Sequence, residues 1–174
     1  MKHVFRLFQM SFTVVVILSL VFPATAIAAS GDLDTTFSGD GKVMTTFTAG
    51  MNSRAWDVAI QEDGKIVVVG DAEGATTNKN VGIARYTKAG ALDKTFNLTG
   101  KKTIDIAGFF DQGTGLVIVP VSKKIIFVGQ TCPGDGSVCD LIIGRVNSDG
   151  SMDSSFNGTG KRVDDFGGND NGSF

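Results

Sequence analysis

The sequence LDTTF at residues 33–37 returns as LDKTF at 92–96 and as MDSSF at 152–156. The copies lie 59 and 60 residues apart, and self-similarity at a fixed period is the signature of a repeat architecture. A Gly-Lys pair follows each copy at the same interval, at 41–42, 100–101 and 160–161.

Two further blocks keep the same order and period. DGKIVVVG at 63–70 matches SKKIIFVG at 122–129, and VGIARY at 81–86 matches LIIGRV at 141–146. The first pair is offset by 59 residues and the second by 60, so one residue is inserted after Gly129. The sequence therefore predicts two full repeats and a partial third, at 31–89, 90–149 and 150–174.

Each repeat is predicted to hold four short strands. Val, Ile, Phe and Thr fill these runs, and frequent glycines separate them (23 of 174 residues), which is typical of a many-turned β fold. Asp63-Gly64 is a type I′ hairpin signal between the second strand and the third. The fold class expected is all-β: tandem four-stranded antiparallel blades in an incomplete β-propeller-like array. In the first repeat the strands are expected at 42–47, 55–60, 65–70 and 81–86.

The N-terminus has the layout of a secretory signal peptide. Lys2 and Arg6 form a positive region, and a 12-residue apolar run follows at 11–22. This run is too short for a membrane-spanning helix, which needs about 20 residues. Small residues at 24–29 favour cleavage after Ala28. The sequence thus predicts a signal peptide at 1–28 and a β-repeat domain at 29–174, located in the periplasm, at the cell surface or outside the cell.

Composition argues against several function classes. Without residues 1–28 the chain keeps 14 basic and 18 acidic side chains, a net charge of −4, and loses its only histidine. A mildly acidic body disfavours nucleic-acid and anionic-membrane partners. Without histidine, a Ser-His-Asp or Cys-His site cannot form, and a zinc site is disfavoured. We therefore expect no enzymatic activity and no cofactor.

The L-D-x-T-F block, the D-G-K-I-V-V-x-G hairpin and the ARY-like fourth strand resemble the delta-60 repeat. The resemblance covers about residues 31–174. It implies a secreted bacterial protein with a β-propeller-like structure, in a family whose molecular role is largely unassigned. Propellers usually have 4–8 blades, so two blades leave open sheet edges, and open edges favour self-association or pairing with other repeats.

The recurring aspartates of the LD block have two readings. They could form a ladder of Ca²⁺ ligands, or each could cap the following turn above a buried phenylalanine. Each repeat supplies only one carboxylate, which favours capping. Two arginines recur in the fourth strands, and a buried arginine needs an anionic partner, so they are predicted to pair with these aspartates. The aspartates are Asp34, Asp93 and Asp153. The phenylalanines are Phe37, Phe96 and Phe156, and the arginines are Arg85 and Arg145.

Three further features of the sequence lie outside the repeating pattern. Cys132 and Cys139 are predicted to form a disulfide, because two cysteines in an exported chain favour one. Trp56, the only tryptophan, is predicted to lie in the core because no aromatic residue repeats at its position. The segment 167–170 resembles part of a Ca²⁺-binding nonapeptide in a single copy.

Three functions are ranked on these grounds. The first is a non-enzymatic exported repeat module with a scaffold or surface-interaction role. The second is a carbohydrate-binding module assembled as an oligomeric ring. The third, ranked last, is an extracellular polysaccharide hydrolase that uses two aspartates.

Overall fold

The computed structural model describes residues 31–75, 78–107, 110–134, 138–168 and 170. The predicted signal peptide and the cut after Ala28 lie outside these residues. All eight strands described below belong to one compact unit, which begins at Leu33. Over the ranges described, no helix is long and apolar enough to span a membrane.

The described residues form eight strands and no helix, which confirms the all-β fold class. The strands are β1 (Ser53–Ile60), β2 (Ile66–Glu73), β3 (Lys79–Tyr86), β4 (Lys101–Ile104), β5 (Phe110–Ile118), β6 (Ile125–Cys132), β7 (Asp140–Val146) and β8 (Lys161–Asp164).

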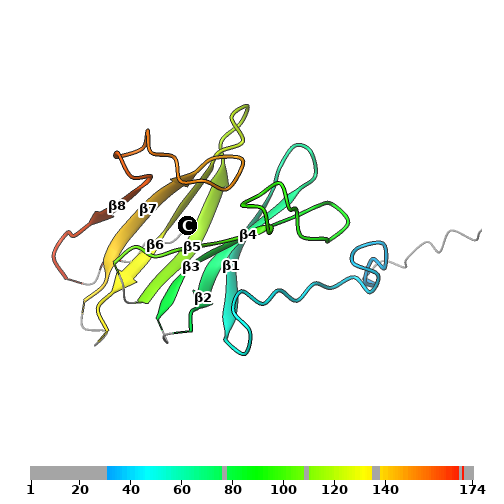
Figure 1. Ribbon diagram of the computed structural model, residues 1–174, viewed down its shortest axis with the longest axis horizontal. Coiled ribbons are helices and arrows are strands. Elements are labelled where there is room, and N and C mark those ends of the chain that lie inside the picture. Colours follow the sequence, from blue (N-terminus) through cyan, green and yellow to red (C-terminus); the bar gives the residue numbers. More distant parts are fainter. Residues whose placement is uncertain (1–30, 76–77, 108–109, 135–137, 169, 171–174) are drawn as a thin grey trace, which may run out of the picture. The chain divides into compact units, whose positions relative to one another are not determined.

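The strands form one open sheet with two equivalent halves (Figure 1). Antiparallel pairing joins β1, β2, β3 and β4 in sequence, and β5, β6, β7 and β8 in the same way. We call these sets the first half and the second half. A single parallel pair, Lys79 with Phe110, joins them.

The fourth strand of each half comes from the following repeat, which corrects the predicted strand grouping. Residues 92–100 reverse the chain after β3, because Asp93 N–H donates to Arg85 O and Arg85 N–H donates to Gly100 O. The Gly-Lys segment then returns beside β3 as β4, and β8 returns beside β7 in the same way. The predicted strand at 42–47 lies outside the sheet, because no third strand precedes it in this unit.

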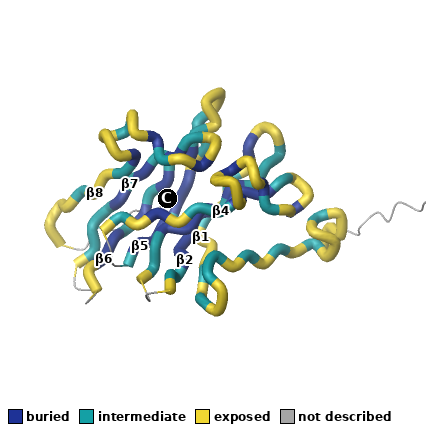
Figure 2. Tube along the Cα trace, viewed as in Figure 1, coloured by how far each residue is buried: buried dark blue, intermediate teal, exposed yellow. Residues whose placement is uncertain are grey.

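The hydrophobic core lies between the two halves. β5 contacts β1, β2 and β3, and alternation along the strands directs every second side chain inward. Burial is concentrated on these strands (Figure 2). The fully buried core side chains include Val67, Val69, Ile83 and Phe96 from the first half, and Ile125, Phe127, Ile142 and Val146 from the second.

A β-bulge interrupts the first pairing of each half. The register skips Trp56 in β1 and Thr114 in β5, and a glycine lies opposite each bulge. An added Cβ at Gly70 would lie 1.8 Å from the Arg54 carbonyl oxygen, so this close backbone approach requires glycine. Trp56 is half exposed, so the core prediction for it was wrong. The bulge lies in β1, the strand at the end of the sheet, and the Trp56 side chain remains 50% exposed there.

The predicted type I′ turn was also wrong. Gln61 N–H donates to Lys65 O, and within this turn only Gly64 has a positive φ. The hairpin is thus a wider turn with one left-handed residue at its end. Lys123 takes the place of Gly64 in the second half, with a φ of 53°.

Candidate functional site

The recurring arginines pair with the LD aspartates, as predicted. Arg85 Nε lies 2.8 Å from Asp93 Oδ2, and Lys65 Nζ lies 3.1 Å from the same oxygen. In the second half, Arg145 Nε and Lys124 Nζ each lie 2.6 Å from Asp153 Oδ2.

The same aspartates cap the turn that follows them. Asp93 Oδ1 accepts hydrogen bonds from the Thr95 N–H and hydroxyl, and Phe96 is buried with the Arg85 guanidinium 4.9 Å from its ring centroid. Asp153 caps through Ser155 in the same way. Asp34 caps through Thr36, but it is exposed and has no ion pair among those found in the described chain.

The environment of these carboxyl groups holds their pKa values low. Burial raises the pKa of Asp93, but hydrogen bonds from Thr95 and Lys65 and the charge of Arg85 lower it well below its usual range. For Asp153, the Lys124 ammonium makes the largest contribution to a similarly low pKa. Both groups are thus ionised at any ordinary pH and neutralised by fixed cations. This arrangement supports the capping role for the repeated aspartates.

Arg85 and Arg145 differ in one contact. Each donates through Nε to its aspartate and through Nη2 to the hydroxyl two residues after it, Thr95 or Ser155. Arg85 Nη1 also donates to Ser148 O in the second half, at 2.6 Å. Within the described ranges no hydrogen bond is found for Arg145 Nη1. The Arg145 side chain is 26% exposed, against 4% for Arg85.

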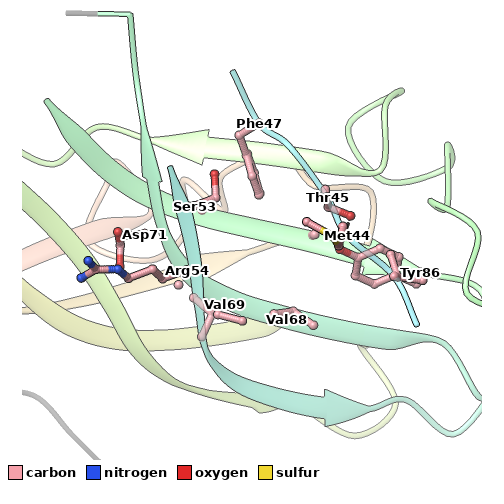
Figure 3. Close-up of a pocket in the computed structure, with 14 residues that line it drawn as sticks. Met44, Thr45, Phe47, Ser53, Arg54, Val68, Val69, Asp71 and Tyr86 are labelled. Atoms are coloured by element: carbon pink, nitrogen blue, oxygen red, sulfur yellow. Dashed lines mark hydrogen bonds between the residues drawn. The ribbon is translucent and has the colours of Figure 1, made fainter. Parts of the chain in front are cut away.

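Residues 42–47 lie against the first half and line one side of an open cavity of about 270 Å³ (Figure 3). The Tyr86 hydroxyl donates to Thr45 Oγ1 at 2.6 Å, and Lys101 Nζ donates to Thr46 O at 2.5 Å. Phe47 packs over Gly82, where an added Cβ would lie 3.3 Å from its ring. Val68, Ala84 and Tyr86 line the floor of the cavity.

One end of this cavity is polar. Figure 3 shows Arg54 and Asp71 together at that end, away from Tyr86. Asp71 is fully buried and accepts a hydrogen bond from Trp56 Nε1 at 2.7 Å and one from Gln112 Nε2 at 3.3 Å. Lys79 Nζ lies 3.4 Å from its other oxygen. An exposed aromatic ring therefore lies beside charged and neutral polar groups.

Sequence reasoning missed Trp56 and Asp71 as site residues. Neither belongs to the repeating pattern, because Gln130 replaces Asp71 in the second repeat. The 59-residue offset would align Trp56 with Gly115. The two bulges instead make Thr114 the structural counterpart of Trp56. The signal that could have identified them is their departure from the repeat.

The disulfide between Cys132 and Cys139 is present and joins the end of β6 to the start of β7. Beside it, carboxylate oxygens of Asp140, Asp165 and Asp170 lie within 4.8 Å of one another. Asp170 N–H donates to Cys139 O, and two of these carboxylates accept backbone hydrogen bonds, from Phe166 and Gly167. Part of the 167–170 segment, Asn169, lies outside the described residues.

Comparison with known proteins gives one family match. Residues 61–96 match a family model described as a β-propeller domain of unknown function, DUF5122. The matched range runs from the β1–β2 hairpin through β2 and β3 to the LD turn, and supports a β-propeller-like repeat family. No curated protein and no solved structure matches the chain.

Proposed function

We propose that this chain is an exported, non-catalytic β-propeller-like module of the delta-60 kind, in which each sheet half is one blade. Its role is to act as a scaffold through surface interactions. The interaction surface is the side of the first half that faces away from the core. We call it the first outer face and define it by Val58, Val68, Ala84 and Tyr86.

The structural use of the repeated charged side chains supports a non-catalytic role. Asp93 and Asp153 each bind two cations and cap a turn, so neither is placed as an acid or a base for a substrate. The only histidine, His3, falls in the predicted signal peptide.

The single observation that carries the proposal is the apolar first outer face. Register pairing aligns Val58, Val68 and Ala84 across β1, β2 and β3 on one side of the sheet. Val58 is 59% exposed, and Met44 on the covering segment is 99% exposed. Ala84 and Tyr86 are buried beside residues 42–47, so Val58 and Met44 form the exposed apolar part of this region. Contiguous exposed apolar patches mark interaction surfaces.

The test is binding of the purified chain to envelope fractions of the cells that make it. Wild type is expected to sediment with the envelopes, and Val58→Asp is expected to reduce the bound fraction at least about tenfold, because it places a charge in the apolar contact. Leu98→Asp is the matched control, since Leu98 is equally apolar, 87% exposed and off this face. Equal binding by all three proteins, or none by wild type, would contradict the proposal.

A carbohydrate-binding role is a second candidate, favoured by the Trp56 site. A half-exposed indole held by Asp71 beside Arg54 combines a stacking surface with polar groups. Titration with soluble oligosaccharides should then change the emission of Trp56, the only tryptophan in the sequence. An unchanged spectrum, together with no heat of binding by calorimetry, would exclude this candidate.

A further inference from the structure

We infer that the first outer face binds the second half of another copy of this chain, in a head-to-tail contact that repeats the contact between the two halves. This inference rests on the proposed function and names the partner of its surface. The other partner in this contact is the side of the second half that faces away from the first half. We call it the second outer face and define it by Val117, Ile126, Val128, Ile143 and Arg145.

The second outer face is equivalent to a face that is buried in the first half. Val67, Val69 and Ile83 are completely buried between the halves. Their repeat counterparts Ile126, Val128 and Ile143 are only half buried, and within the described ranges no further sheet half packs on them. The second half therefore presents the surface that, one repeat earlier, forms the core.

The first outer face is the matching side of the same contact. In the second half, Leu116, Phe127 and Gly144 lie in one row across β5, β6 and β7 and pack against the first half. Their counterparts in the first half are Val58, Val68 and Ala84. The chain thus contains one complete contact between sheet halves. It also carries the two surfaces that a second contact of this kind would need, on opposite sides, so they cannot meet within one copy.

Polar groups repeat in the same manner. Arg85 Nη1 donates to Ser148 O across the inter-half contact. Arg145 Nη1 has no such bond among the described residues, and the carbonyl equivalent to Ser148 O belongs to Lys88 on the side of the first outer face. Docking a second copy would bring the Arg145 of one copy to the Lys88 carbonyl of the other.

Residues 33–47 now occupy part of this docking position. Ser38 N–H donates to Ala89 O at 2.9 Å, as Asn97 N–H donates to Asp149 O at 2.7 Å one repeat later. Lys101 Nζ donates to Thr46 O, as Lys161 Nζ donates to Asp105 O. The segment therefore lies where the turn and fourth strand of a preceding sheet half would lie.

This cover is held less firmly than the element it replaces. Its Asp34 is exposed, whereas Asp153 of an incoming second half keeps its bonds to Arg145 and Lys124. Its residues 42–47 have no strand partner, whereas β8 is paired with β7. A complete second half can therefore displace the cover and restore equivalent hydrogen bonds.

The contact joins two different faces, so it is heterologous and has a direction. This direction gives a sharp test by sedimentation velocity of the purified chain. Wild type is expected to form species larger than a monomer as its concentration rises. Val58→Asp and Ile143→Asp should each weaken self-association at least about tenfold, because each charges one face.

A mixture of the two variants tests whether the first outer face of one copy binds the second outer face of another. Val58→Asp keeps an intact second outer face and Ile143→Asp keeps an intact first outer face, so together they should form a one-to-one dimer that grows no further. Leu98→Asp should behave as wild type. If circular dichroism shows Ile143→Asp to be unfolded, Ile143→Thr should give the same pattern with a smaller shift in dissociation constant.

Three outcomes would overturn the inference: a wild type that stays monomeric at all concentrations, single variants that associate as wild type does, or a mixture without a dimer. A monomeric wild type whose binding to envelopes still depends on Val58 would refute this inference alone. Loss of both properties would refute the proposed function as well.

Discussion

Arg85 Nε donates a 2.8 Å hydrogen bond to Oδ2 of Asp93, and both side chains are almost entirely buried. This pair joins the end of β3 to the turn that leads into β4. It therefore holds together the strand reversal by which one repeat supplies the fourth strand of the preceding sheet half. Arg145 and Asp153 form the same link in the second half, at a more exposed position.

Replacing Arg85 should destabilise the protein strongly. Arg85→Gln leaves the carboxylate of Asp93 with Lys65 as its only cation, and breaking a buried pair costs about 3–5 kcal/mol. The free energy of unfolding, measured by urea titration with Trp56 emission, should fall by that order. Arg145→Gln is the matched control and should cost clearly less, because solvent screens its pair. Equal losses would mean that burial does not decide the strength of this link.

The stability should fall in acid because of Asp93. Its pKa is lowered in the folded state, so its contribution is complete above the unfolded value near 4 and is lost as the pH falls below it. Urea titrations at pH 2–5 should show a shallower fall for Asp93→Asn than for wild type. A slope unchanged by the substitution would contradict this assignment.

Asp111 should act in the opposite direction. Burial raises its pKa, against hydrogen bonds from the Thr131 hydroxyl and Ile106 N–H. Because the folded pKa lies above the unfolded one, the stability it contributes is present below pH 4 and lost as the pH rises through the folded pKa. Asp111→Asn should remove this loss, which a comparison of unfolding free energies between pH 4 and 7 would detect.

Two left-handed positions should gain stability from glycine. Leu98 has a φ of 60° where the other copies carry Gly39 and Gly158, and Lys123 has a φ of 53° where the first half carries Gly64. A side chain in this conformation costs roughly 1–2 kcal/mol. Leu98→Gly and Lys123→Gly should each raise the free energy of unfolding by about 1 kcal/mol. Lys94→Gly, in the same turn but without a positive φ, should not.

The disulfide should stabilise the fold modestly. It closes a loop of seven residue steps, for which the loss of chain entropy in the unfolded state is about 2–3 kcal/mol. The double variant Cys132→Ser with Cys139→Ser should lower the free energy of unfolding by that amount. Reductant should have the same effect on wild type and none on the variant. A variant as stable as wild type would show that the loop is already ordered without the bond.

Much of the candidate site could be predicted from the repeat, and some of it could not. The pairing of Arg85 and Arg145 with LD aspartates was predicted because a buried arginine in a repeating strand needs a repeating anion. The structure decided the partners, Asp93 for Arg85 and Asp153 for Arg145. Trp56 and Asp71 were missed because they break the repeat, and a one-residue bulge changes which positions are equivalent.

The sequence by itself determined the period, the order of the blocks, the capping aspartates and the disulfide, because these depend on local spacing and on residue chemistry. Only the tertiary structure decided which strands pair. The Gly-Lys segment has nearly the same pattern in all three copies, yet it forms β4 and β8 and leaves residues 42–47 outside the sheet. A strand needs hydrogen-bond partners from another part of the chain, and the described residues before the first copy hold no strand that could provide them.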